Sequence, residues 1–93
     1  MKEEVLLAGA GWLGMPLALR LKEIGYDVRV VGQTAEKKGE FHRLGIEYLC
    51  VDYNQLPKLR CKKLIICIPP TENYLSIIQN LLNAVQPSFT LFT

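Results

Sequence analysis

The chain has 93 residues, of which 49% are hydrophobic and 22% are charged, and its formal net charge is +2. These values predict one folded domain, because disordered chains carry fewer apolar residues and more net charge. So small a net charge points to no nucleic-acid partner, and no apolar run approaches the ~18 residues that a membrane span requires. Three cysteines without a C-x-x-C pair and a single histidine predict neither a disulfide framework nor a zinc site, so we expect a reduced, cytoplasmic protein.

Short apolar runs alternate with helix-like segments along the chain, which is typical of a parallel α/β sheet. We predict strands at residues 5–8, 28–31, 46–51, 64–68 and 89–92. Right-handed crossovers place these strands in the order 3-2-1-4-5. The predicted fold is therefore a Rossmann-type, three-layer α/β fold. It forms one domain over residues 1–93, truncated within its fifth strand.

Three helices are predicted between these strands. The first covers residues 12–24, and helical spacing predicts a buried stripe of Leu13, Leu17, Leu21 and Ile24, with Ala18 filling in. The second covers residues 35–44, with Phe41 and Leu44 as its apolar anchors. The third follows a capping Thr71, and its predicted buried face holds Tyr74, Leu75, Ile78, Leu81, Leu82 and Val85.

The string G-A-G-W-L-G reads G-x-G-x-x-G and lies between the first strand and the first helix, the context that dinucleotide binding requires. Gly9 permits the tight turn, Gly11 lets a pyrophosphate approach the backbone, and Gly14 lets the helix pack on the sheet. Free N–H groups at the helix start then hold the anion. Trp12 and Leu13 belong to the same loop, where Trp12 either covers the phosphates or packs on the sheet. The alternative is a glycine turn that serves packing alone.

The residues at the end of the second strand decide between NAD and NADP. An acid there would bind the ribose hydroxyls of NAD, but this chain has Gln33 and Thr34 and no carboxylate before Glu36. Gln33 and Thr34 can donate to a phosphate, and Lys37 and Lys38 add positive charge. The sequence therefore favours NADP over NAD. The alternative is that both lysines are merely solvated.

Two further segments follow predicted strands at the same edge of the sheet. Asp52 either accepts a hydrogen bond from the adenine amino group or bonds its own backbone in a turn. Ile68 and Pro69 either line the pyrophosphate and nicotinamide side of the site or simply end the fourth strand. Tyr53 and Tyr74 are candidates for shaping the cleft.

The remaining reactive side chains receive no functional role. His42 belongs to the polar second helix, which predicts a surface position. Cys50 and Cys67 fall within apolar strands and are predicted to be inert core residues. Cys61 lies between two basic residues, but nothing nearby supplies a base.

The run from Leu6 to Ala18, with its string G-W-L-G-M-P-L-A, resembles the opening of the atypical extended short-chain dehydrogenases, a family of NAD(P)-dependent epimerase/dehydratase-like proteins. The resemblance continues through the end of the second strand to the two prolines after the fourth. It implies that the three motif glycines hold the pyrophosphate, that Gln33 and Thr34 meet the adenosine ribose, and that Asp52 meets the adenine. A weaker resemblance links the chain to 6-phosphogluconate-dehydrogenase-type cofactor domains, which share the glycine motif and an apolar strand ending in proline.

The catalytic Ser/Thr and the Tyr-x-x-x-Lys pair of the short-chain dehydrogenases do not occur in this chain. We therefore predict the NAD(P)-binding domain of an oxidoreductase or epimerase-like protein, without a catalytic half of its own. The alternatives are a regulatory nucleotide-sensing Rossmann module and a degenerate fragment with an empty site. The apolar terminal strand, residues 89–92, predicts a homodimer that pairs through this edge.

Overall fold

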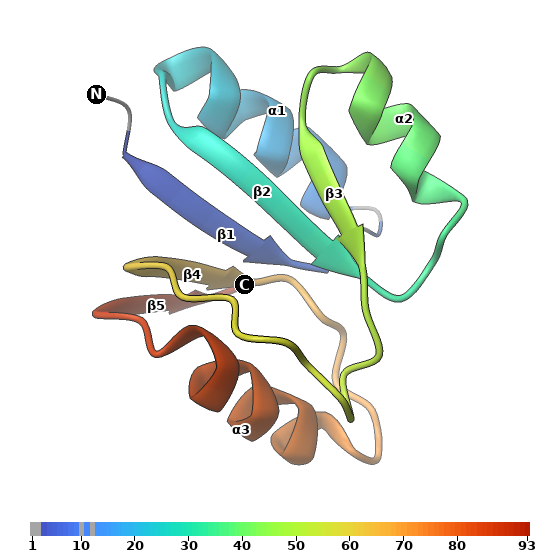
Figure 1. The fold of residues 1–93 in the computed structure, drawn as a ribbon, viewed down its shortest axis with the longest axis vertical. Coiled ribbons are helices and arrows are strands. Elements are labelled where there is room, and N and C mark those ends of the chain that lie inside the picture. Colours follow the sequence, from blue (N-terminus) through green and yellow to red (C-terminus); the bar gives the residue numbers. More distant parts are fainter. Residues whose placement is uncertain (1–2, 10, 12) are drawn as a thin grey trace.

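The computed structural model describes residues 3–9, 11 and 13–93, and this part of the chain forms a five-stranded parallel sheet with helices on both faces (Figure 1). The strands are β1 (Glu4–Ala8), β2 (Asp27–Gly32), β3 (Glu47–Cys50), β4 (Lys63–Ile66) and β5 (Phe89–Phe92). The helices are α1 (Gly14–Ile24), α2 (Lys37–Arg43) and α3 (Tyr74–Val85). The strand order is β3-β2-β1-β4-β5, which confirms the predicted topology. The direction of sheet growth reverses between β1 and β4, so the carboxyl ends of these strands form the switch point where such sheets bind ligands.

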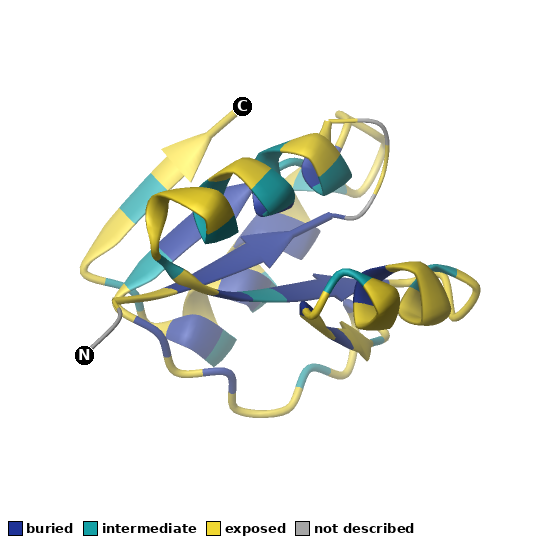
Figure 2. Cartoon of the chain, turned by 90° about the horizontal axis from the view of Figure 1, so that it is seen from above, coloured by how far each residue is buried: buried dark blue, intermediate teal, exposed yellow. Residues whose placement is uncertain are grey.

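Helices α1 and α2 cover one face of the sheet and α3 covers the other (Figure 1). Strand β1 contributes to both cores because neighbouring side chains point to opposite faces: Leu7 packs with the α1–α2 layer and Leu6 with α3, and both are fully buried. This double burial explains why residues 5–8 of β1 form an unbroken apolar run. Figure 2 shows the central strands buried and the outward faces of the helices exposed. None of the described helices is both long and apolar enough to cross a membrane.

The buried face of α1 differs from the predicted stripe. Leu13, just before the helix, and Ile24, at its end, are 53% and 59% exposed, whereas Gly14 is buried, as is Ala18, which was expected to fill in the stripe. The reason is the contact of Gly14 with the preceding turn, where a Cβ atom at this position would collide with the carbonyl oxygen of Gly9. This backbone contact fixes which side of the helix meets the sheet, so the small residues face inward and leucines on the flanks are only partly covered.

The buried face of α3 also differs from the prediction. Ile77 is buried, whereas Leu75 is 81% exposed and Leu82 is 37% exposed. The predicted cap is wrong as well, because the helix is preceded by Asn73, whose side chain makes no capping bond. The Thr71 hydroxyl lies instead 3.0 Å from the Asn73 side-chain oxygen. Several apolar residues compete for the sheet-facing side of α3, and spacing alone did not select among them.

The segment between β3 and β4, residues 51–62, has no helix and crosses beneath the sheet to reach α3 (Figure 1). Backbone hydrogen bonds join Leu59 N–H to the Ala84 carbonyl (3.0 Å) and Cys61 N–H to the Val85 carbonyl (3.3 Å). Near its start, the side-chain amide of Asn80 donates to the Tyr53 carbonyl at 2.8 Å. Helix α3 therefore fixes the path of this segment from Tyr53, after the end of β3, to the start of β4.

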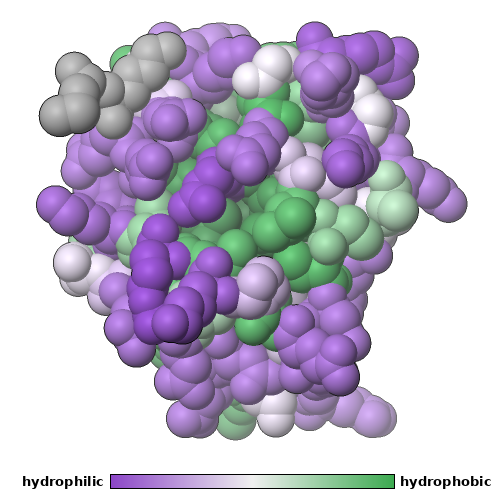
Figure 3. Space-filling model, viewed as in Figure 1, coloured by the Kyte–Doolittle hydropathy of each residue, from purple (hydrophilic) through white to green (hydrophobic). Residues whose placement is uncertain are grey.

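Hydrophobic side chains gather in the middle of the face seen in Figure 3, and hydrophilic side chains surround them. Residues 51–62 pack against this face with the buried side chains of Tyr53, Leu59 and Cys61. The segment thus closes the core where a crossover helix is lacking. It also brings an aromatic side chain to the switch point.

Candidate functional site

The turn that follows β1 can be made only by glycine at its first position. Gly9 adopts a left-handed backbone with φ of 112°, and a Cβ atom there would lie 2.7 Å from the Cys67 carbonyl oxygen. Its N–H donates to the Val31 carbonyl at 2.8 Å, and the Cys67 N–H donates to the Ala8 carbonyl at 2.8 Å. This turn therefore joins the ends of β1, β2 and β4 at one point.

The other two motif glycines have different surroundings. A Cβ atom on Gly14 would collide with the Gly9 carbonyl oxygen, so the fold itself requires glycine there. Gly11 is exposed, and a Cβ atom on it would meet no heavy atom of the described residues within 4 Å. Protein packing therefore does not explain glycine at position 11. Glycine at this position of the motif is the residue that permits close approach of a ligand to the backbone.

The start of α1 is free to receive an anion. Its N-cap residue, Leu13, provides no side-chain cap, and the first helical turn carries no acidic residue. The N–H groups at the start of a helix and the positive end of its dipole favour negative charge. Because α1 begins directly after the glycine turn, both features bring a diphosphate to the same place.

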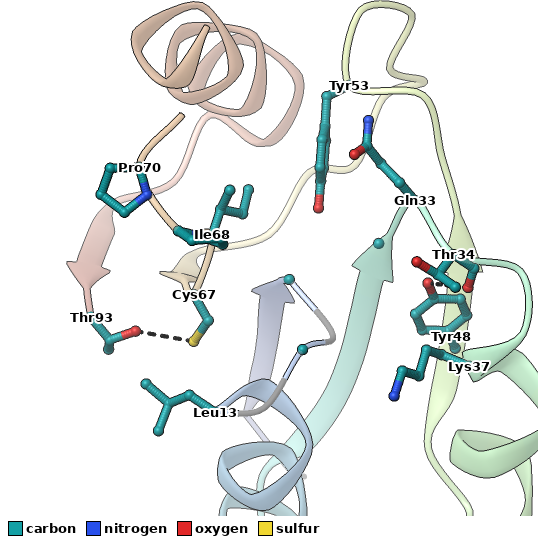
Figure 4. Close-up of a pocket in the computed structure, with 14 residues that line it drawn as sticks. Leu13, Gln33, Thr34, Lys37, Tyr48, Tyr53, Cys67, Ile68, Pro70 and Thr93 are labelled. Atoms are coloured by element: carbon teal, nitrogen blue, oxygen red, sulfur yellow. Dashed lines mark hydrogen bonds between the residues drawn. The ribbon is translucent and has the colours of Figure 1, made fainter. Parts of the chain in front are cut away.

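A pocket of about 510 Å³ opens at the carboxyl ends of the strands, beside the glycine turn (Figure 4). Its lining comes from every one of these strand ends, and comprises Gly9, Gly11, Leu13, Gly32, Gln33, Thr34, Lys37, Tyr48, Tyr53, Cys67, Ile68, Pro69, Pro70 and Thr93. Most of the predicted site residues are among them. Gly14 lies behind the turn, buried against Gly9, and Trp12 lies outside the described residues.

Asp52 is not part of this lining. Its carboxylate accepts a hydrogen bond from the Asn54 backbone N–H at 2.9 Å, two residues further on. This is the turn geometry that the sequence left open as an alternative to an adenine contact. The next residue, Tyr53, faces the pocket instead.

One side of the pocket is formed by the residues after β2. Figure 4 shows Gln33, Thr34 and Lys37 grouped there, with Lys37 extending beside Tyr48. The Tyr48 hydroxyl donates to the Thr34 carbonyl at 2.7 Å, and burial raises the pKa of this phenol. The Lys37 ammonium lies 3.9 Å from the Glu40 carboxylate, and Lys37 is the only charged residue in the lining described above. This side is therefore suited to an anionic group.

The opposite side of the pocket carries Cys67, Ile68, Pro70 and Thr93 (Figure 4). The sequence assigned Cys67 to the core, which is wrong, because β4 ends at Ile66 and the thiol lies beyond it, partly exposed, 3.2 Å from the Thr93 hydroxyl. Cys50 is likewise exposed, at the last position of β3. Both strands end earlier than predicted, so these thiols lie at the carboxyl ends of the strands and not within the core.

Tyr53 lines the pocket, as one of the two tyrosines that the sequence offered for shaping the cleft, whereas the sequence gave no indication of Tyr48 or Thr93. Only 4% of the residue is exposed, yet its ring forms part of the pocket wall. Burial raises the pKa of its phenol to about 12, and the neighbouring Tyr48 adds to this shift. The only signal in the sequence was an aromatic residue directly after a predicted strand.

An open parallel sheet in which a glycine turn leads from the first strand into a helix defines the Rossmann class of NAD(P)-binding domains. Within this class, the chain belongs to the family of the NAD binding domain of 6-phosphogluconate dehydrogenase, which it matches over residues 4–92. The family is the weaker of the two resemblances seen in the sequence. The expected membership in the short-chain dehydrogenases is not supported by this match or by the similar structures.

Two solved structures illustrate the fold. The NAD(P)-binding domain of an exopolyphosphatase-related protein from Archaeoglobus fulgidus has a TM-score of 0.79 at 18% identity, covering 98% of this chain and 72% of that one. An imine reductase from Pseudomonas sp. has a TM-score of 0.59 at 17% identity, covering 96% of this chain and 40% of that one. At these identities the likeness establishes the fold alone. No curated protein sequence matches the chain.

Proposed function

We propose that this domain binds NADP(H) in preference to NAD(H) and serves as the cofactor-binding unit of an oxidoreductase. The observation that carries the preference is the chemistry of the pocket beside β2. An amide, a hydroxyl and an ammonium group, from Gln33, Thr34 and Lys37, line it, and the described lining contains no carboxylate. A carboxylate at the end of β2 is what favours the free ribose hydroxyls of NAD, whereas these groups accommodate a 2′-phosphate.

Different residues along the pocket contact different parts of the cofactor. The glycine turn and the start of α1 hold the diphosphate through backbone N–H groups. Gln33, Thr34 and Lys37 hold the phosphorylated ribose, and Ile68 and Pro69 line the end that takes the nicotinamide. The bound cofactor supplies hydride chemistry, and the chain supplies its position and orientation.

Calorimetric titration with NADP⁺ and NAD⁺ tests the preference. Lys37→Ala should weaken NADP⁺ binding roughly fivefold and leave NAD⁺ binding nearly unchanged, because it removes a charge that faces only the 2′-phosphate. Lys38→Ala is the matched control, since Lys38 is exposed on the same helix and does not line the pocket. Gln33→Asp should shift the preference toward NAD⁺. Tighter binding of NAD⁺ than of NADP⁺ by the unaltered protein would contradict the proposal.

Association through β5 stays a prediction. This strand is an edge of the described sheet, and its side chains Phe89, Leu91 and Phe92 are exposed. An uncharged apolar edge favours pairing with a second copy. Light scattering should then report a dimer at micromolar concentration, and replacing both phenylalanines by lysine should give a monomer. A monomer before any substitution refutes the expectation.

A further inference from the structure

Tyr53 is held in place by parts of the protein far from the glycine turn. Its backbone carbonyl accepts a hydrogen bond of 2.8 Å from the Asn80 side chain of α3, and its ring packs in the core between the sheet and α3. The residue is 4% exposed. The position of its ring is therefore set by the fold.

The hydroxyl of Tyr53 points into the pocket. Figure 4 shows the ring descending from the far wall, with its oxygen directed toward the tips of β1 and β2 and toward the side where Leu13 lies. Among the described residues this hydroxyl has no hydrogen-bond partner, whereas the hydroxyl of Tyr48, which packs on the other face of the sheet, donates to the Thr34 carbonyl at 2.7 Å. Because this hydroxyl opens onto the pocket and is not bonded to a protein acceptor, it is available to a polar ligand group there.

The ionisation of Tyr53 suits a donor to an anion. Because burial raises the pKa of this phenol to about 12, the hydroxyl keeps its proton at physiological pH. A neutral phenol can donate a hydrogen bond to a phosphate oxygen without repelling it. Hydrogen bonds to charged acceptors are also stronger than those between neutral groups.

We propose that the Tyr53 hydroxyl donates a hydrogen bond to the diphosphate of the dinucleotide, from the wall opposite the start of α1. The inference rests on the proposed function. It adds one side-chain hydrogen bond, from Tyr53, to the backbone N–H groups proposed to bind the diphosphate. The diphosphate is then held between the N–H groups that follow Gly11 and the phenol of Tyr53. Because NAD and NADP share the diphosphate, Tyr53 contributes equally to both, unlike Gln33 and Lys37.

The test compares Tyr53→Phe with the unaltered protein for four ligands: ADP, NAD⁺, NADP⁺ and adenosine 2′-monophosphate. Tyr53→Phe should weaken the first three by about tenfold each, which equals about 1.4 kcal/mol. It should leave adenosine 2′-monophosphate, which lacks a diphosphate, unchanged. Tyr74→Phe is the matched control, because it removes the same atom from a residue that does not line the pocket.

Other outcomes overturn the assignment. If Tyr53→Phe binds all four ligands as the unaltered protein does, the inference fails while the proposed function stands. If only NADP⁺ and adenosine 2′-monophosphate are weakened, Tyr53 contacts the 2′-phosphate and not the diphosphate. If the unaltered protein binds no dinucleotide, both proposals fall. In protein labelled at the tyrosine ¹³Cζ position, ADP should shift the Tyr53 signal and adenosine 2′-monophosphate should not, a readout that requires no variant to fold.

Discussion

Replacing motif glycines by alanine should separate those that the fold requires from the one that a ligand requires. Gly9 has φ of 112° and a hypothetical Cβ 2.7 Å from the Cys67 carbonyl oxygen, whereas Gly25, with φ of 114°, has no heavy atom within 4 Å of its Cβ position. Gly25→Ala therefore reports the left-handed backbone cost alone, about 1–2 kcal/mol. Gly9→Ala adds a steric clash of about 1–3 kcal/mol. Gly11→Ala has neither penalty and should change the free energy of unfolding by less than about 0.5 kcal/mol.

The helical glycines form a second matched pair. Gly39 lies within α2, and a Cβ atom there would have no described heavy atom within 4 Å. Gly39→Ala should therefore stabilise the protein by about 0.5–1 kcal/mol, because alanine has a higher helix propensity than glycine. Gly14→Ala makes the same chemical change in α1 but forces a Cβ against the Gly9 carbonyl oxygen, which is backbone and cannot swing aside. We expect Gly14→Ala to destabilise the protein by about 1–3 kcal/mol despite the gain in propensity.

Urea denaturation followed by circular dichroism measures these differences, and calorimetry with NADP⁺ measures binding for the variants that fold. Gly11→Ala should be the variant that keeps its stability and loses affinity, because its methyl group projects into the space proposed for the diphosphate. Two results refute the reasoning. One is a loss of stability in Gly11→Ala as large as in Gly9→Ala, and the other is unchanged NADP⁺ affinity in Gly11→Ala.

Three further predictions concern Tyr53, Phe41 and Leu75. Because burial raises the pKa of folded Tyr53 to about 12 from 10.0, the unfolded chain ionises first, and the stabilising contribution present below pH 10 is lost as the pH rises to 12. Two pKa units correspond to about 2.7 kcal/mol at full titration, so the unaltered protein should lose about 2 kcal/mol more stability than Tyr53→Phe between pH 9 and pH 12. Phe41 is fully buried and stacks on Tyr48 at 5.3 Å between ring centroids, so Phe41→Ala should cost about 3–5 kcal/mol in denaturation experiments. Leu75→Ala, on the exposed side of α3, should change stability by less than about 0.5 kcal/mol.

The topology could be predicted because it depends on local patterns and on one general rule of handedness. β1 and β4 are too uniformly apolar to be half-buried strands, and each predicted crossover had one allowed hand. The helix faces could not be predicted in the same way. In α3, Leu75, Ile77 and Leu82 all fit a plausible stripe, and only packing against the sheet chooses Ile77. In α1 the choice depends on the contact between Gly14 and Gly9, which involves no large side chain at all.

The residues of the candidate site likewise fall into those that the sequence predicts and those that only the fold places. Gln33, Thr34 and Lys37 reach the pocket because they follow directly from the end of β2, so counting along the chain was enough to find them. Tyr53 and Asp52 are neighbours after β3, and the sequence pattern favoured Asp52 as the residue that contacts a ligand. The choice between them depends on the path of residues 51–62, which α3 fixes through Asn80 from much later in the chain. A contact so distant in sequence leaves no local signal.

The three motif glycines therefore carry different information, although the pattern presents them as equals. Gly9 and Gly14 are needed wherever a strand turns this tightly into a helix, so finding them indicates the fold and nothing about a ligand. Gly11 has open space around it, and the folded chain would tolerate a larger residue there. A glycine that the protein does not need is best explained by something that the protein binds. The choice between a structural glycine turn and a dinucleotide site thus depends on the middle position of the motif, and here that position favours the site.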